Sequence, residues 1–406
     1  MLLILISATP TIQAGLLPVQ ELFNTGVAAY KKGDLATART LFLTGLEQQP
    51  NNPTLLYATG FINRKSGAIP ASIYYYEKAL ENQPNHVDAA FGLAQSYHAV
   101  GNVKHCWQLF NRWRKDKLAH YPQEPSQLCN KHVLIRAEWG LGDMMHYIRY
   151  ALKIKRLGCH VTVEAARPIT QLLNNCWYID HVIPKGHMLP PYDYEIPLLY
   201  LPTLFKTSLE TIPAEVPYLY PNNDLVQKWQ PLFERDHATK IGICWDMGHH
   251  DTNLPGWQRA APLENWLPLF ETPGLSFYCL QKESCDPLKK LPAHISVYQF
   301  DPTFDVQHGG FMDTAAAMQH LDLVITVDTA IAHLAGGLGI PVWVLLPNNP
   351  DYRWMLEGSK TPWYPTMKLF RQKSAGDWQP VIAEIKQELH KLVHNATQDL
   401  QHNNQK

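Results

Sequence analysis

Asp328, Thr329 and His333 are the residues whose types and spacing most clearly suggest chemistry. They stand in the stretch DLVITVDTAIAHLAGGLGIPVWVLLP, residues 322–347. The continuous apolar run from Leu323 to Val327 predicts a buried parallel strand. Asp-Thr then lies at the carboxyl end of a strand and the start of a helix, where open α/β sheets bind ligands and helix N–H groups attract phosphate. The turn therefore predicts an anion or nucleotide site.

The predicted helix after this turn consists largely of small residues, so it can lie close to the sheet and bring its backbone near a ligand. These small residues are Ala332, Ala335, Gly336, Gly337 and Gly339. A second apolar strand, Pro341 to Leu346, completes a β-α-β unit. The apolar pattern alone is equally typical of any such crossover. The polar turn, with His333 one helical turn further on, favours the ligand site.

A second motif with chemical potential is HVLIRAEWGLGD, residues 132–143, which reads as a strand ending in a Gly-rich turn. It places Asp143 at the start of a predicted helix. Asp is a common N-cap there; the alternative is a carboxylate at the floor of a cleft, poised as a general base. Gly140 and Gly142 would let the backbone turn sharply and a substrate approach closely.

The chain beyond residue 130 alternates predicted strands and helices in two blocks, which we assign to domains at 128–235 and 236–396. This alternation predicts two doubly wound α/β domains that face each other across a cleft. Gln281 ends the predicted strand LSFYCLQ at the edge of that cleft. Its amide either contacts a nucleotide or caps the loop.

The first part of the chain, residues 16–120, is repetitive. Overlaid on itself at an offset of 34 residues, it aligns glycines, small residues and aromatic residues in three copies. The aligned sets are Gly33, Gly67 and Gly101; Gly26, Gly60 and Ala94; and Phe42, Tyr76 and Phe110. This pattern resembles the tetratricopeptide repeat, a stack of helical hairpins. Such a solenoid usually holds a protein partner, and the alternative is a passive spacer or dimerising unit.

Composition restricts the remaining classes of function. The chain is 46% hydrophobic and 17% charged with a formal charge of −1, and no basic stripe indicates a nucleic-acid binder. Its seven cysteines form no CxxC pair, which favours free thiols. The apolar segment at 1–15 is too short to span a membrane and is either a short export signal or part of a cytoplasmic protein. The HHD motif at 249–251 is more typical of a loop than of a metal site, and the polar tail at 397–406 is expected to lack fixed structure.

From about 130 to 395 the chain resembles the glycosyltransferase family 9 domain, which includes the ADP-heptose lipopolysaccharide heptosyltransferases. The motifs that carry the resemblance are WGLGDMMHYIRYA, IGICWDMG, FYCLQKE, FMDTAAAMQHLDLVITVDTAIAHLAGGLGIPVWVLLP and DYRWMLEGSKTPWYPTMKLFRQ. The resemblance implies a GT-B fold: two Rossmann-like domains, with the acceptor bound mainly by the first and the sugar nucleotide mainly by the second.

The resemblance also implies roles for single residues. Asp143 matches the proposed catalytic base. Asp328, Thr329 and His333 match residues that face the donor diphosphate and sugar. Arg259 is the candidate for the basic side chain that neutralises the leaving diphosphate.

The sequence thus predicts a tetratricopeptide solenoid followed by a GT-B glycosyltransferase that moves a sugar from a nucleotide-sugar donor to a protein or glycan acceptor. The expected reaction inverts the anomeric centre and needs neither a metal nor another cofactor. No nucleic-acid partner is expected, and cytoplasmic placement is favoured over export. Ala330, where heptosyltransferases often have Gly, favours the alternative of a non-catalytic repeat scaffold with a degenerate nucleotide-binding domain.

Overall fold

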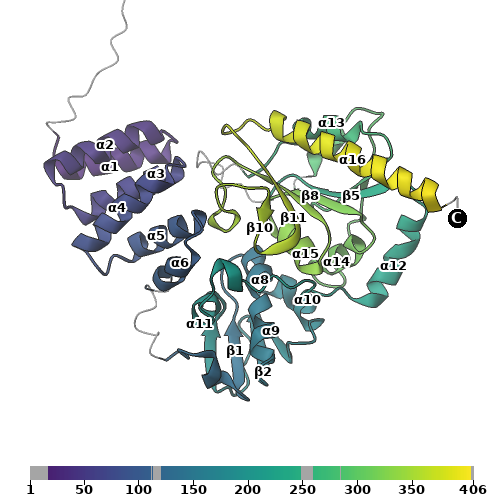
Figure 1. Ribbon diagram of the computed structural model, residues 1–406, viewed down its shortest axis with the longest axis horizontal. Helices are drawn as coiled ribbons and strands as arrows, with labels where there is room; N and C mark the ends of the chain where they lie inside the picture. The colour runs from purple at the N-terminus through teal and green to yellow at the C-terminus, as the bar shows by residue number, and fades with distance from the viewer. Residues whose placement is uncertain (1–16, 111, 113–119, 248–258, 284, 404–406) are drawn as a thin grey trace, which may run out of the picture.

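The computed structural model describes residues 17–110, 112, 120–247, 259–283 and 285–403. The predicted apolar segment at 1–15 and the HHD motif at 249–251 lie outside these residues. No helix in the described ranges is long and apolar enough to cross a membrane. Three parts follow one another along the chain: a group of helices, a small α/β domain and a larger α/β domain (Figure 1).

The first part consists of consecutive helices that pack in pairs, α1 with α2, α3 with α4, and α5 with α6. Their bounds are α1 Val19–Lys31, α2 Leu35–Gln48, α3 Pro53–Lys65, α4 Ile69–Asn82, α5 Val87–Ala99 and α6 Val103–Phe110. The aligned glycines Gly33, Gly67 and Gly101 all have left-handed backbones, with φ of 87°, 79° and 81°, so each provides the turn within a pair. The predicted helical hairpins are present, and their assignment as tetratricopeptide repeats stays a prediction.

Glycine and aromatic side chains pack together inside these pairs as the repeat pattern requires. A Cβ placed on Gly26 would lie 2.5 Å from the ring of Phe42, and one on Gly60 would lie 2.8 Å from the ring of Tyr76. The glycines therefore create the space that each aromatic ring fills in the next helix.

The first α/β domain has a parallel sheet in the order β3-β2-β1-β4. Its elements are β1 His132–Arg136, α8 Leu141–Tyr147, α9 Arg149–Lys155, β2 His160–Ala165, α10 Thr170–Asn174, β3 His181–Pro184, β4 Tyr194–Pro197 and α11 Leu201–Leu204. The next helix, α12 Asn223–Glu234, packs against α14 Met312–Met318 of the second domain. The helix predicted to start at Asp143 begins two residues earlier, at Leu141, and the helical segment divides at Ile148 into α8 and α9. Asp143 is the third residue of α8, the N3 position.

The second α/β domain has a sheet in the order β10-β11-β9-β8-β5-β6-β7, and every neighbouring pair except β10 with β11 is parallel. Its elements are β5 Thr239–Cys244, α13 Leu267–Phe270, β6 Leu275–Cys279, β7 Val297–Gln299, α14 Met312–Met318, β8 Leu323–Val327, α15 Ala330–Leu338, β9 Val342–Leu346, the 3-10 turn η9 Tyr352–Trp354, β10 Lys360–Thr361, β11 Tyr364–Arg371 and α16 Gln379–Asn403. The prediction of a buried strand at Leu323–Val327 is confirmed residue by residue. Helix α16 continues to Asn403, so the expectation that the tail lacks fixed structure was wrong for its first residues.

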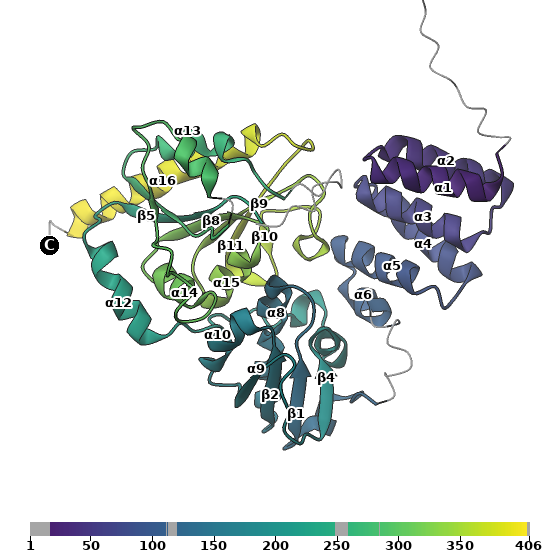
Figure 2. The ribbon, with the colours of Figure 1, turned by 180° about the vertical axis from the view of Figure 1, so that it is seen from behind.

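The strand order explains where a ligand site can form. Numbered from β5 within the domain, the parallel strands run 3-2-1-4-5-6, the order of a doubly wound nucleotide-binding fold. The strand order reverses between β5 and β8, and such a switch point leaves a crevice outside the carboxyl ends of the two strands. Helix α15 starts at this edge and packs against α8 of the first domain. Both views show α8 directly beside α15 where the domains meet (Figures 1 and 2).

Candidate functional site

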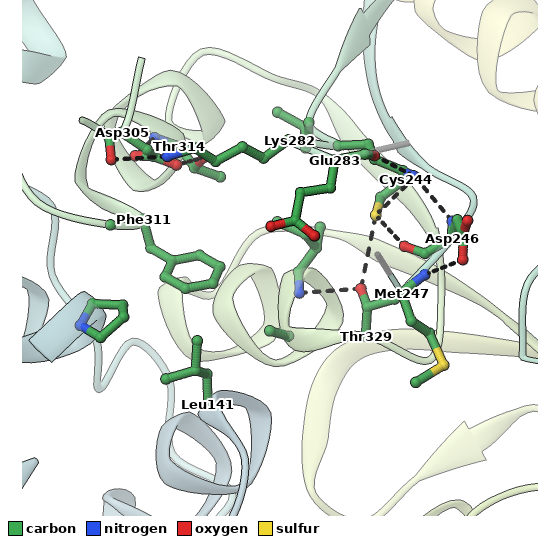
Figure 3. Close-up of a pocket in the computed structure, with 16 residues that line it drawn as sticks. Leu141, Cys244, Asp246, Met247, Lys282, Glu283, Asp305, Phe311, Thr314 and Thr329 are labelled. Carbon is green, nitrogen blue, oxygen red and sulfur yellow. Dashed lines mark hydrogen bonds between the residues drawn. The ribbon is translucent and has the colours of Figure 1, made fainter. Parts of the chain in front are cut away.

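A cavity of about 390 Å³ lies at this switch point, between the two α/β domains. Its walls come from the ends of β5, β6 and β8, from the start of α15, and from Leu141 and Pro168 of the first domain (Figure 3). The lining residues are Leu141, Pro168, Cys244, Asp246, Met247, Leu280, Gln281, Lys282, Glu283, Asp305, Gly310, Phe311, Thr314, Thr329, Ala330 and Ile331. The volume falls within the range of small-molecule sites.

Thr329 and Ala330 bring the start of α15 to the cavity wall. Thr329 is the N-cap of the helix, and its Oγ1 accepts a hydrogen bond from the N–H of Ile331 at 3.2 Å. Ala330 is the first helical residue and lines the cavity. The positive end of the helix dipole therefore faces the cavity, an arrangement that favours a negatively charged ligand group.

Gln281 lines the same cavity, but its amide is occupied by the backbone. Its Oε1 accepts hydrogen bonds from the N–H groups of Trp245 at 3.1 Å and Asp246 at 2.9 Å, and its Nε2 donates to the carbonyl of Glu283 at 2.7 Å. These contacts tie the loop after β5 to the end of β6. Of the two roles predicted for Gln281, the contacts are those of the loop cap.

Asp143 lies at the domain boundary and binds partners from both domains. Its Oδ2 accepts a hydrogen bond from the N–H of Gly140 at 3.1 Å, and its Oδ1 accepts one from Nη2 of Arg353 at 2.6 Å. Its side chain is 16% exposed. The predicted N-cap role is wrong, because Gly140 is the N-cap of α8 and Asp143, at N3, accepts from the N–H of that residue. The carboxylate also crosses to the second domain.

Asp328 belongs to a chain of buried charges that leads back to Asp143. Its Oδ2 lies 3.3 Å from Nη1 of Arg259, and the other guanidinium nitrogen of Arg259 lies 3.7 Å from Asp351. Asp351 lies 2.9 Å from Nε of Arg353, which binds Asp143. Three carboxylates and two guanidinium groups therefore alternate from one domain to the other.

Burial and neighbouring charges shift the pKa values of Asp328 and Asp351 in opposite directions. Burial raises the pKa of Asp328, and Arg259 offsets only part of this effect. Burial would also raise the pKa of Asp351, but Arg353 and Arg259 outweigh it and hold that pKa below its ordinary value. Asp328 Oδ2 accepts no hydrogen bond from any described residue, because its contact with Arg259 has only ion-pair geometry.

His333 lies on α15 behind the cavity wall and does not line the cavity. It is 2% exposed, and its ring stacks on Trp354 at 5.3 Å between centroids. Its Nε2 contacts Nη1 of Arg353 at 3.4 Å, and its Nδ1 lies 2.8 Å from the hydroxyl of Tyr364. Because a guanidinium only donates, Nε2 accepts and Nδ1 carries the proton. Burial and the charge of Arg353 hold the pKa of His333 well below its usual range, so the ring is neutral.

Gly142 explains how the two helices approach so closely. A Cβ at this position would lie 3.0 Å from Cδ2 of His333 and 3.6 Å from Cα of Ala330. The close approach predicted for Gly142 is therefore made to α15. The small residues of α15 serve protein contacts in the same way, since a Cβ on Gly336 would lie 2.5 Å from the ring of Tyr364.

The structure thus brings Thr329, Ala330 and Gln281 to the cavity. It places the other predicted residues in the layer between the domains: Gly140, Gly142, Asp143, Arg259, Asp328 and His333. Their predicted roles in catalysis and donor binding stay predictions. Sequence reasoning missed Asp351 and Arg353, which connect the two sets of charges, and Lys282, whose Nζ donates to the carbonyl of Asp305 at 3.1 Å beside the cavity. The only sequence signal for Arg353 was its place in the DYRWML motif.

No group of three or more His, Cys, Asp or Glu side chains placed to hold a metal ion occurs among the described residues. The cavity instead contains a helix N-terminus, Lys282, and the carboxylates of Asp246 and Glu283, and Figure 3 shows Glu283 projecting into it.

No family model matches the chain. A curated relative, Protein FlbA of Caulobacter vibrioides, is 24% identical over 405 residues, which cover 90% of this chain and 66% of that protein. The chain therefore spans just under two thirds of the length of this relative.

Two solved structures are similar to part of the chain. The glycosyl transferase family 9 protein from Veillonella parvula DSM 2008 has a TM-score of 0.47 and 13% identity, over 60% of this chain and 87% of that one. The ADP-heptose lps heptosyltransferase II of E. coli has a TM-score of 0.46 and 13% identity, over 66% of this chain and 99% of that one. These values do not assign the chain to a family or an activity.

Proposed function

We propose that this protein is a glycosyltransferase of the GT-B type that moves a sugar from a nucleotide-sugar donor to a protein or glycan acceptor. One observation carries the proposal. Asp143 at the start of a helix in the first domain and the N-terminus of α15 in the second face the same domain boundary, beside a cavity at the switch point of the second sheet. The motif resemblance to glycosyltransferase family 9 is consistent with that placement.

The residues at this boundary suit each part of a glycosyl transfer. The acceptor hydroxyl oxygen forms a bond to the anomeric carbon while the bond from that carbon to the diphosphate oxygen breaks. The hydroxyl proton passes to a carboxylate, for which Asp143 is the candidate. Direct displacement of this kind inverts the anomeric centre.

Negative charge builds on the departing nucleoside diphosphate, and donors fixed in advance can stabilise it. The start of α15, the hydroxyl of Thr329 and the ammonium group of Lys282 lie at the cavity wall, where they are the candidates for this role. Arg259 lies one layer deeper, bound to Asp328. In this proposal these groups, and not a metal ion, stabilise the negative charge of the leaving diphosphate. EDTA should therefore leave the turnover unchanged.

The test measures the nucleotide that is released when water takes the place of the unknown acceptor: UDP, GDP or ADP from the diphosphate donors, and CMP from a CMP-sugar. The purified chain is incubated with UDP-, GDP-, ADP- and CMP-sugars, and donor binding is followed by thermal shift. Asp143→Asn should keep donor binding within about threefold and lower turnover by about 100-fold or more, the usual contribution of a positioned base. Full turnover in Asp143→Asn would exclude the role of this carboxylate, and the absence of any donor binding would contradict the function as a whole.

A second candidate is a repeat scaffold that has lost catalysis, and a specific observation favours it. Both oxygens of Asp143 and both ring nitrogens of His333 are occupied by protein groups. A shift of the melting temperature with one nucleotide sugar and no product under any condition would support this scaffold.

A further inference from the structure

The segment from Asn349 to Trp354, which carries Asp351 and Arg353, packs against the helical repeats. Nδ2 of Asn349 donates to the backbone carbonyls of Arg64 at 2.9 Å and Lys65 at 3.1 Å. These two residues end α3, where the last carbonyls of a helix have no partner within the helix. Asn349 therefore caps a repeat helix from the second α/β domain.

His98 of α5 binds the same segment two residues before Trp354. Its side chain is fully buried, and its Nδ1 lies 3.0 Å from the carbonyl oxygen of Tyr352. Because a carbonyl only accepts, Nδ1 carries the proton and donates. The ring also meets the ring of Tyr352 edge to face at 5.1 Å. Tyr352 immediately precedes Arg353, so this contact fixes the backbone next to the guanidinium group that binds Asp143.

The repeat pattern shows that these contacts belong to one face of the helices. Arg64 and His98 occupy the same position in the second and third copies, one period of 34 residues apart. The positive charge of Arg64 also acts on Asp351. A face on which a repeat protein could bind a partner is thus covered, in these two copies, by a segment of the same chain. In both overall views this segment lies against α5 (Figures 1 and 2).

The third helix pair also reaches the loop that precedes Asp143. The ring of Trp139 lies 5.5 Å from Phe91 of α5 and 5.5 Å from Phe110 of α6. Trp139 has a left-handed backbone, with φ of 68°, which a bulky residue adopts only when its surroundings hold it there. Phe110 also contacts the ring of Tyr352 at 6.2 Å. Phe110 of the repeats therefore contacts Trp139, four residues before Asp143, and Tyr352, which immediately precedes Arg353.

We propose that the repeat helices position the catalytic site. By holding Asn349 and Tyr352 on one side and Trp139 on the other, they position Arg353 against Asp143. His98 and Asn349 are positioning residues in this arrangement. The consequence for turnover rests on the proposed function, whereas the consequence for the order of the 349–354 segment does not.

The test uses two matched pairs of variants in the full chain. His98→Leu removes the donor to Tyr352, while His98→Asn keeps an N–H group close to the place of Nδ1. Asn349→Ala removes the contacts with α3, while Asn348→Ala removes a neighbouring amide that binds only the carbonyl of Lys373. Circular dichroism and the melting temperature show that each variant is folded.

The first readout is amide hydrogen exchange of residues 351–354. His98→Leu and Asn349→Ala should accelerate it by about tenfold, the factor expected for the loss of one buried hydrogen bond, and the two control variants should leave it near the wild-type rate. The second readout is donor turnover, in which kcat should fall with these exchange rates while KM for the donor stays within about twofold.

Unchanged exchange of 351–354 in folded His98→Leu and Asn349→Ala would overturn the proposal. Faster exchange with an unchanged kcat would also overturn it, because the segment would then move without affecting the reaction. If no variant and no wild-type protein turns over any donor, the proposed function fails, and the exchange rates still decide whether the repeats hold Arg353.

Discussion

Arg353 of the second α/β domain donates to Asp143 of the first across 2.6 Å, and this ion pair joins the domains beside the cavity. The side chains of Arg353 and Asp143 are 9% and 16% exposed, so solvent screens the pair only weakly. Asp351 holds the other side of the guanidinium group at 2.9 Å. The removal of Arg353 would therefore leave two carboxylates close together with no cation between them.

Arg353→Met should consequently destabilise the protein strongly. We expect the free energy of unfolding in urea to fall by about 3 kcal/mol, the scale for breaking a buried ion pair by removal of one partner. Arg156→Met is the matched control, because Arg156 pairs with Glu215 where both side chains are more than half exposed. That change should cost less than about 0.5 kcal/mol. Equal effects of the two substitutions would contradict the importance of the buried pair.

Gly142→Ala should destabilise the protein although alanine usually stabilises a helix. In an exposed helix the change would gain about 1 kcal/mol. At this site the added Cβ would lie 3.0 Å from His333, whose buried ring stacks on Trp354, so the ring or helix α8 must shift by a few tenths of an ångström. We expect a net loss in the urea titration, together with weaker ligand binding. His333→Ala should relieve the clash, so a double-mutant cycle of the two changes should show a favourable coupling. If the effects of the two changes on the free energy of unfolding simply add, the contact between positions 142 and 333 does not cause the loss of stability.

The sequence was sufficient to predict most of the fold that positions the site. The strand at Leu323–Val327, the two α/β blocks and the helix start at Thr329 follow from apolar runs and turn residues, whereas α8 begins two residues before the predicted Asp143. These are local patterns, which depend on neighbouring residues in the chain. They also led us to expect that the carboxyl ends of both sheets would face one boundary.

The charge network could not be predicted in the same way. Asp351 and Arg353 lie at the start of the short 3-10 turn η9, where charged residues are ordinary and no periodicity marks them. Their significance arises only when the fold brings Asp143 and Arg259 next to them. Similarly, the helix pattern placed His333 one turn into α15, but only the packing of Trp354 shows that the ring is covered.

Tyr364→Phe should cost more stability than the loss of a typical tyrosine hydroxyl. The hydroxyl of Tyr364 lies 2.8 Å from Nδ1 of His333 and 2.9 Å from Nδ1 of His146, and both rings are buried. Its removal would leave the Nδ1 atoms of both buried rings without this partner, so we expect a loss of about 2 kcal/mol in the free energy of unfolding. Tyr150→Phe is the control, because its hydroxyl binds only Thr207 within the first domain. A loss no larger than that of the control would argue against the shared hydrogen bonds.

Stability should fall in mild acid because buried histidines resist protonation. Burial lowers the pKa of His98 to about 4, although Tyr352 and Asp351 act in the opposite direction, and burial also lowers the pKa values of His146 and His333. The unfolded chain binds a proton at each histidine near pH 6.5, before the folded protein does. Stability is therefore complete above this pH and is lost as the pH falls from about 6.5 towards 4.

For His98 alone this effect amounts to about 2 kcal/mol at pH 5, since each pKa unit corresponds to about 1.4 kcal/mol. Asp328, whose pKa burial raises, contributes with the opposite sign as the carboxyl protonates. The comparison of wild type with His98→Asn isolates the histidine, because both proteins retain Asp328 and the other two rings. Urea titrations at pH 7.5 and 5 should show a loss that is about 2 kcal/mol smaller in the variant. Equal losses in the two proteins would mean that His98 takes up its proton at the same pH in the folded and the unfolded chain. That result would contradict the lowered pKa of the buried ring.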